Sequence, residues 1–474
     1  MTRTTILVVA VAGLSGLAIG FLGFASPTML GTPTGPQIKK MQRPVVHGDV
    51  PPTPPESPRT EFALGADDVS NDRETPAVAV DAKGRVLLAW AIQKGENTRT
   101  IQLARSSDGG KTFDGPTPLR DVPIYKFTSQ GKGKAMAFST HVLPRLVAVG
   151  DEMYLAWVEA INGGPEVVEF LARSSDGGRT FGEPTRVHGK EASRPGFTTL
   201  SAAPDGTLLA AWLDGRAKKG QQPYFTTKPA ASEGFEADRL VFAGSESKGI
   251  CPCCDLATLR LPDGSDLVAF RNSDGGHRDV WVARAAKGSE FAPPTPLSPD
   301  RWTFDGCPHD GPSLTLDGDQ VYAAWMSAHS GKNQVYAAKA SAGDLAFRPL
   351  PLGHETGRTQ GHPKLAQAGP GKVYAVWDES LDAAPAASST PTAKGGHEGH
   401  QHGAARTGSG RAIMFAEGSN SFNSAWPVAP REGSFQLNPA IAINKEGMVL
   451  VAWNELDSSG KRVVLVLLDP AKGR

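Results

Sequence analysis

The chain has 474 residues and carries 49 Lys and Arg against 49 Asp and Glu, so its formal net charge is zero. This balance argues against a protein dedicated to nucleic-acid binding, because such proteins carry a basic excess. Hydrophobic residues make up 39% of the chain, enough for a sizeable core, and the 54 Gly and 38 Pro indicate many turns. We therefore expect an ordered, mostly β protein.

The N-terminus has the features of a targeting segment. Arg3 is followed by an uncharged apolar run from Ile6 to Phe24. This run is long for a secretory signal and adequate for a membrane span, and Gly23 and Ala25 allow cleavage. Residues 1–26 are therefore either a signal peptide or a membrane anchor. Both readings predict export to the periplasm or the extracellular space, with membrane contact through this segment only. Residues 27–59 form a Pro-rich linker.

An internal repeat runs through the rest of the chain. Alternating apolar residues follow a Gly turn and end in Trp at positions 90, 157, 212, 325, 377 and 453, with Phe270 in the missing place. From Trp157 to Trp377 the steps are 55, 58, 55 and 52 residues. A fixed period of about 50 residues is typical of repeat architectures such as propellers.

Each repeat unit reads as four short strands. In the first unit, residues 77–80, 86–90 and 100–105 read as three strands, and residues 117–119 start a fourth strand. Four strands at this period predict an all-β, seven-bladed β-propeller over residues 60–474, preceded by the hydrophobic helix and linker. The last unit, Asn438–Asp469, has only three strands. We expect residues 61–69 to supply the fourth, because an open ring would leave exposed strand edges.

Two turns share the pattern Ser-x-Asp-x-Gly-x-Thr-Phe. Their Asp can cap backbone N–H groups, and their glycines permit positive φ. The pattern resembles the Asp box of the sialidase-like, BNR-repeat propellers, which implies a structural role on the face opposite that family's active site. The matching residues are Ser106, Asp108, Gly110, Thr112 and Phe113 in the first unit and Ser174, Asp176, Gly178, Thr180 and Phe181 in the second.

The resemblance also raises the question of exo-α-sialidase activity. The family uses an arginine triad, a Tyr nucleophile paired with Glu, and an Asp acid/base. Its Arg-Ile-Pro motif is absent here, the nearest match being Arg73-Glu-Thr-Pro76, and the last tyrosine, Tyr374, lies inside a strand pattern. The family enzymes have six blades, whereas we count seven units. We assign no catalytic residue and keep a glycosidase or glycan-binding protein as the alternative.

All four cysteines lie just before the first strands of two neighbouring units. These segments should emerge opposite the Asp-box turns, around the channel mouth, and the equivalent segments of other units carry further histidines. Thiolates and imidazoles are ligands for zinc and copper. We therefore predict a transition-metal site formed by Cys251, Cys253, Cys254, Cys307, His309, His141 and His362.

Two further features bear on the metal hypothesis. An even number of cysteines in an exported chain also fits disulfides, which would make the protein a stapled scaffold for a protein partner, and a third reading is redox-active thiols. The insertion at about residues 381–410 is expected to be disordered and contains His397, His400 and His402. These histidines are either an accessory metal-binding loop or part of a solvated polar loop.

Arginines on the expected channel-mouth face suggest a small anionic or glycan ligand. They are Arg194, Arg216, Arg271 and Arg278. The main hypothesis is thus an exported binding protein with a Cys/His site for copper or zinc, and the sequence itself does not choose between these metals.

Overall fold

The computed structural model describes residues 59–63, 75–131, 134–245, 249–352, 357–382 and 409–471, all within one compact unit, residues 40–474. These residues form β-strands and a single 3-10 turn, η1 (Ile161–Gly163). No helix within them is long and apolar enough to span a membrane. The hydrophobic segment 1–26 and the linker up to residue 58 lie outside the described residues.

Strand pairing gives five antiparallel four-stranded sheets, one eight-stranded sheet and one two-stranded hairpin. In the eight-stranded sheet, β26 and β28 pair in parallel at a single position, and we divide the sheet there for description, so that the four-stranded groups are called blades 1 to 7. Blade 1 holds β2 (Ala77–Val80), β3 (Val86–Gly95), β4 (Thr98–Ser106) and β5 (Asp114–Pro123). Blade 2 holds β8 (Arg145–Val149), β9 (Glu152–Ala160), β10 (Val167–Ser174) and β11 (Thr185–Arg186). Blade 3 holds β12 (Gly196–Ala202), β13 (Leu208–Asp214), β14 (Gln222–Lys228) and β15 (Arg239–Leu240).

The remaining blades follow the same order. Blade 4 holds β16 (Ala257–Arg260), β17 (Asp266–Arg271), β18 (Val280–Ala285) and β19 (Thr295–Pro296). Blade 5 holds β20 (Ser313–Asp317), β21 (Gln320–Ser327), β22 (Gln334–Ser341) and β23 (Arg348–Leu350). Blade 6 holds β24 (Gln360–Gln367), β25 (Val373–Ser380), β26 (Arg411–Gly418) and β27 (Ala425–Pro427). Blade 7 holds β28 (Phe435–Ile443), β29 (Val449–Asp457), β30 (Gly460–Leu468) and β1 (Arg59–Ala63), and a hairpin of β6 (Lys126–Gly131) and β7 (Lys134–Ser139) links blades 1 and 2.

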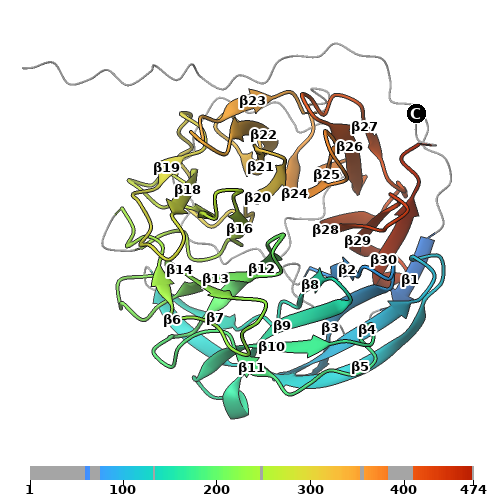
Figure 1. Ribbon diagram of the computed structural model, residues 1–474, viewed down its shortest axis with the longest axis horizontal. Coiled ribbons are helices and arrows are strands. Elements are labelled where there is room, and N and C mark those ends of the chain that lie inside the picture. The colour runs from blue at the N-terminus through green and yellow to red at the C-terminus, as the bar shows by residue number, and fades with distance from the viewer. Residues whose placement is uncertain are drawn as a thin grey trace, which may run out of the picture. The chain divides into compact units, whose positions relative to one another are not determined.

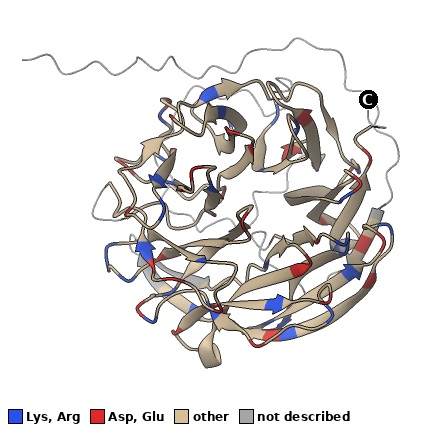
Figure 2. Ribbon diagram, viewed as in Figure 1, with Lys and Arg blue, Asp and Glu red and all other residues tan. Residues whose placement is uncertain are grey.

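The first strands of the blades meet at the centre. Each contacts the first strand of the next blade, and β28 returns to contact β2, so the contacts close a ring. Figure 1 shows the sheets arranged around this centre. Figure 2 shows both signs of charge spread over the blades, as expected for a chain of zero net charge. The all-β, propeller-like fold predicted from the repeat is confirmed.

The repeated Trp anchors the core between blades. Trp212, Trp377 and Trp453 are fully buried. Residues two apart on a strand point to the same side. An acidic residue two positions after the Trp can therefore accept a hydrogen bond from the indole N–H. Trp212 Nε1 donates to Asp214 Oδ2 at 3.0 Å, and Trp453 Nε1 donates to Glu455 Oε2 at 3.2 Å. The polar edge of each large side chain is thereby satisfied inside the core.

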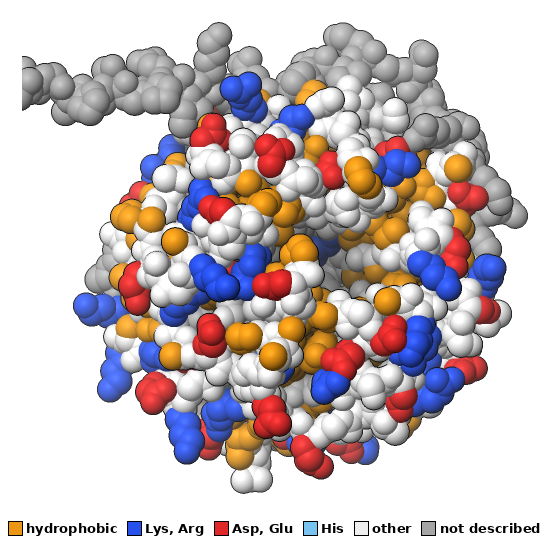
Figure 3. Space-filling view, viewed as in Figure 1, with side chains coloured by type: hydrophobic (Ala, Val, Ile, Leu, Met, Phe, Trp, Pro, Cys, Tyr) orange, Lys and Arg blue, Asp and Glu red, His pale blue; other side chains and the backbone are white. Residues whose placement is uncertain are grey.

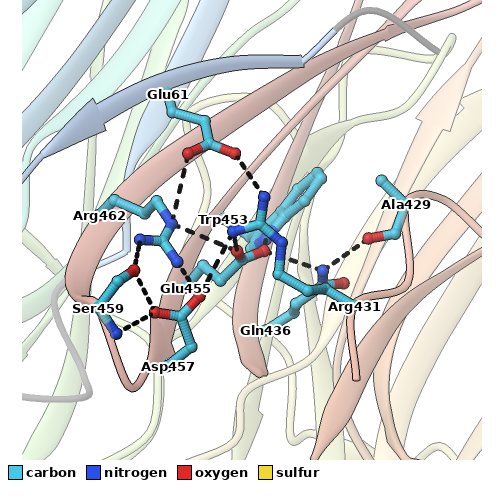
Figure 4. A network of polar contacts seen from close by, with 9 residues as sticks. All are labelled: Glu61, Ala429, Arg431, Gln436, Trp453, Glu455, Asp457, Ser459 and Arg462. Carbon is cyan, nitrogen blue, oxygen red and sulfur yellow. Dashed lines mark hydrogen bonds and ion pairs between the residues drawn. The ribbon is translucent and has the colours of Figure 1, made fainter. Parts of the chain in front are cut away.

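The predicted closing strand is present. β1 pairs antiparallel with β30, from Arg59 opposite Val466 to Ala63 opposite Arg462. In Figure 4, the Glu61 carboxylate lies between Arg431 and Arg462, at 3.3 Å and 3.6 Å. The N-terminal strand therefore completes blade 7, although β1 ends at Ala63, before the predicted end at residue 69, and residues 64–74 lie outside the described part.

The two Asp boxes are turns between third and fourth strands. Although burial opposes it, hydrogen bonds from the hydroxyl and N–H of Thr112, from Ser106 and from the Lys111 N–H lower the pKa of Asp108 to about 2. A Cβ on Gly110 would lie 2.5 Å from Leu450 Cδ2, so this turn packs closely on blade 7. Ser106 and Val80 both pair with Val86, which places the box at the end of the first strand and opposite its entrance.

Candidate metal centre and hub

The segments that enter blades 4 and 5 are held against each other by their backbones. The N–H of Cys251 donates to the carbonyl of Arg271, the last residue of β17. A Cβ on Gly311 would lie only 2.4 Å from the carbonyl oxygen of Asp255. Glycine at position 311 thus permits the close approach that brings the cysteines of both segments to one place.

Three thiols form a buried cluster at this point. Cys251 Sγ lies 3.8 Å from Cys253 Sγ and 3.8 Å from Cys254 Sγ, and all three sulfurs lie within 4.8 Å of one another. Cys307 packs against this cluster from the neighbouring blade. None of the four is in a disulfide, whose sulfurs would be about 2.05 Å apart. A zinc ion with Zn–S bonds of about 2.3 Å in tetrahedral geometry separates its sulfurs by about 3.8 Å.

The thiols are not equivalent electrostatically. Burial raises the pKa of Cys253, and it raises that of Cys254 to about 12. Hydrogen bonds from Cys251 and Cys253 lower the pKa of Cys307, and the positive charge of Arg278 acts in the same direction. Arg271 likewise favours the thiolate of Cys254. A metal–thiolate centre carries negative charge, and the two arginines provide its counter-charge.

The predicted histidines take different positions. His309 Nδ1 lies 3.3 Å from the carbonyl oxygen of Cys253, so its ring adjoins the thiol cluster. The ring of His141 lies 6.0 Å from that of Phe197, which in turn packs on the cysteines. His362 does not join the thiols, because its Nδ1 lies 2.5 Å from Asp378 Oδ2. The histidines at 397, 400 and 402 lie outside the described residues.

The four predicted arginines are engaged by the protein itself. Arg216 forms ion pairs with Asp214 and Asp238, both at 2.7 Å. The buried Arg271 donates to the backbone carbonyls of residues 278, 310 and 326, and Arg278 donates to the carbonyl of Gly306. Arg194 stacks over the ring of Phe127, at 5.2 Å from its centroid. Their positions indicate structural roles, and for Arg271 and Arg278 a role beside the thiols.

Sequence reasoning missed a charged group at the centre of the ring. We call it the hub and define it as Arg145, Asp255, Asp310, His362 and Lys364. Arg145 donates to Thr75 Oγ1, to the carbonyl of Thr198 and to Asp255 Oδ2, at 2.9, 2.8 and 3.0 Å. These partners belong to three other blades or their entrances, so the side chain of Arg145 crosses the centre.

His362 is the most tightly held residue of the hub. A β-bulge between Gly361 and Lys364 gives it a positive φ of 53°, and its backbone N–H donates to Asp310 Oδ2 at 2.6 Å. Asp378 also accepts from Arg411. Burial opposes protonation, but the charges of Asp378 and Asp310 raise the pKa of His362 to about 9. The imidazole is therefore positively charged at neutral pH.

Comparison with known proteins shows a similarity of fold only. No family model and no curated protein matches it. Among solved structures, a PL25 polysaccharide lyase, an ulvan lyase bound to a GlcA–Rha3S glycan, superposes with a TM-score of 0.50 at 11% identity, covering 86% of this chain and 96% of that one. A leech intramolecular trans-sialidase gives 0.41 at 12% identity, covering 67% of each chain. A Penicillium chrysogenum α-L-arabinanase gives 0.43 at 15% identity, covering 69% of this chain and 94% of that one.

The superposition on the lyase supports the propeller-like architecture. At such low identity the similarities carry no site residue from one chain to another. The thiol cluster and the hub must therefore be interpreted from their own chemistry.

Proposed function

We propose that the protein is an exported, seven-bladed propeller that binds one transition-metal ion at Cys251, Cys253, Cys254 and Cys307, with His309 as an additional candidate ligand. The observation that carries this proposal is the convergence of thiols from two blades: Cys251 Sγ lies 3.8 Å from the sulfurs of Cys253 and Cys254, and Cys307 packs against these three residues from the neighbouring blade. Thiolate-rich sites favour zinc and cuprous copper over magnesium or calcium. When bound, the metal would act as a soft Lewis acid or as a stored ion.

The site also has the surroundings that a metal centre needs. The three clustered cysteines are almost fully buried, which excludes water and slows oxidation. Arg271 and Arg278 lie where they stabilise thiolates. Deprotonation of the thiols accompanies metal binding, so we expect affinity to increase with pH.

The deciding experiment uses tag-free protein lacking residues 383–408, so that the histidine-rich loop contributes no metal. The reduced protein is loaded with Zn²⁺ or Cu⁺, desalted, and analysed for metal by mass spectrometry. We expect one ion per chain, and loss of that ion in Cys251→Ser and Cys307→Ser. Ser289→Ala, at an exposed turn of blade 4, keeps all four thiols and serves as the control that should retain the ion. Full metal content in the Cys→Ser variants would contradict the proposal.

Thiol counting in denaturant tests the scaffold alternative. Four free thiols in protein isolated without reductant, or four released by a chelator, support the metal site. Two complete disulfides would refute it and favour a stapled interaction scaffold.

We also propose that residues 1–26 direct export and that residues 27–59 act as a spacer. Fractionation of cells producing the full chain, followed by N-terminal sequencing, tests this proposal. Recovery in the cytoplasm would contradict export. A mature N-terminus near residue 26 would identify a cleaved signal, and an intact Met1 in the membrane fraction would identify an anchor.

A second candidate function is binding or cleavage of a glycan. It is supported by the likeness to the ulvan lyase, which extends over 86% of this chain. The test is incubation with sialosides, arabinan and ulvan, followed by chromatography of the products. Release of products that disappears in His362→Gln would support an enzyme acting at the hub, and unchanged polymers would refute it for these glycans.

A further inference from the structure

The ammonium group of Lys364 has no hydrogen-bond or ion-pair partner among the described residues. Its side chain is surrounded by protein, which lowers its pKa, yet part of its surface remains accessible to solvent. Lys364 lies on β24, one of the first strands that meet at the centre of the ring, and Figure 3 shows a hollow near that centre. The charges of Asp255, Arg145 and Asp310 also act on the pKa of Lys364, and these residues come from three other blades or their entrances.

Five of the seven blades carry a small residue at the first-strand position that Lys364 occupies in blade 6. In every blade, one first-strand residue pairs with the residue just before the repeated Trp or Phe. Arg145 and Lys364 occupy this position in blades 2 and 6. The other five blades carry Ala77, Thr199, Ala257, Ser313 and Ala440. Arg145 and Lys364 are therefore the two long side chains at this level of the ring.

The acidic groups near Lys364 are engaged by other residues. Arg145 pairs with Asp255, and Asp378 accepts from both His362 and Arg411. Asp310 accepts from the backbone N–H of His362. Among the described residues Lys364 thus has no acidic partner, and the carboxylate of a ligand would supply one.

We infer that the hub binds a small carboxylate ligand, with its carboxylate on Lys364 and flanked by Arg145 and His362. The rest of the ligand extends toward the small side chains of blades 1, 3, 4, 5 and 7. A hydrogen-bonded carboxylate satisfies the desolvated ammonium, as buried charges require. This inference does not require a bound metal. It shares the hub with the glycan proposal, but binding of a free carboxylate is measured separately from cleavage of any polymer, so that either proposal can fail without the other.

The test measures binding by calorimetry and by thermal shift. The probes are glucuronate, its neutral counterpart glucose, and acetate as a carboxylate without a sugar. We expect glucuronate to bind and to raise the melting temperature, while glucose does neither. Binding of acetate as well would show that the carboxylate suffices, and its failure would identify a sugar acid as the preferred class. If neither carboxylate binds at millimolar concentration, the inference is wrong.

The variants locate the binding to one side chain. Lys364→Met keeps length but removes the charge, and we expect affinity for glucuronate to fall at least about tenfold. Lys364→Arg should keep most of it. Lys372→Met, at an exposed lysine of the same blade paired with Glu417, is the control and should bind like the native chain. Without ligand, Lys364→Met should melt no lower than the native chain, because it loses an unpartnered ammonium. Unchanged affinity in Lys364→Met, or a large fall in its melting temperature, would overturn the inference.

Discussion

Arg145 and Asp255 form an ion pair between two blades that are not neighbours in the ring. Arg145 opens β8 of blade 2 and Asp255 precedes β16 of blade 4, and the guanidinium Nη2 lies 3.0 Å from the carboxylate Oδ2. The two side chains are only 15% and 23% exposed. This pair connects blades 2 and 4 directly, in addition to the contacts that each of them makes with blade 3 between them.

We predict that Asp255→Asn lowers the free energy of unfolding by about 1–3 kcal/mol, because Arg145 then keeps only neutral acceptors. Urea denaturation of metal-free, reduced protein measures this change. Asp151→Asn is the control, since its pair with Lys83 is about half exposed, and should change stability by no more than about 0.5 kcal/mol. Equal changes in the free energy of unfolding would mean that the Arg145–Asp255 pair stabilises the fold no more than an exposed ion pair does.

A second prediction concerns the close approach of Gly311 to Asp255. Gly311→Ala places a methyl group against a backbone carbonyl that cannot rotate away, so the two cysteine segments must move apart. We expect a loss of about 1–3 kcal/mol in stability and weaker metal binding. Gly343→Ala, whose Cβ would meet only Ser341 Oγ at 3.6 Å, is the control. Competition with a zinc indicator measures the affinity, and an unchanged affinity in Gly311→Ala would show that the segments need not touch.

The pKa of His362 predicts a pH dependence of stability. Its folded-state pKa of about 9 exceeds the usual value of 6.5. Its contribution is therefore complete below about pH 6.5 and is lost as the pH rises through 9. The shift corresponds to at most about 3 kcal/mol, and residual solvent exposure reduces it.

The measurement compares denaturation of the native chain and His362→Gln from pH 6 to pH 10. Glutamine keeps a hydrogen-bond donor near Asp378 but does not titrate. The difference in unfolding free energy between the two proteins should shrink as the pH increases. Parallel profiles would show that His362 is not charged in the folded state.

The repeat pattern was sufficient to predict much of the fold. Alternation, Gly turns and the periodic Trp predicted the strands of blade 1 and the completion of blade 7 by the N-terminal strand, because these features depend on local chemistry and on a fixed period. The boundaries were less accurate: β5 runs from Asp114 to Pro123, well beyond residues 117–119. Pairing with a neighbouring strand extends a strand beyond its own propensity.

The site was predictable only in part. Proximity of Cys307 to the other cysteines followed from the adjacency of blades 4 and 5. The hub did not, since Arg145 and Lys364 are ordinary surface residue types, and their meeting depends on closure of the ring. An alignment of the units on the repeated Trp would have shown two charged residues at a position that otherwise holds Ala, Ser or Thr. The pairing of His362 with Asp378 depends on the bulge at 361–364, and no local sequence motif predicts this bulge.

A last prediction concerns β1 and compares the contributions of apolar packing and of ion pairs to stability. Phe62 is 6% exposed and its ring lies 5.1 Å from that of Trp90, so β1 bridges blades 7 and 1. Phe62→Ala should cost about 3–4 kcal/mol, because it opens a cavity at this junction. The neighbouring Glu61→Gln weakens the ion pairs of a partly exposed carboxylate with Arg431 and Arg462 and should cost less than about 1 kcal/mol. Urea denaturation of both variants tests the ranking. A larger effect of Glu61→Gln would mean that the polar network of Figure 4, rather than apolar packing, holds the ring closed.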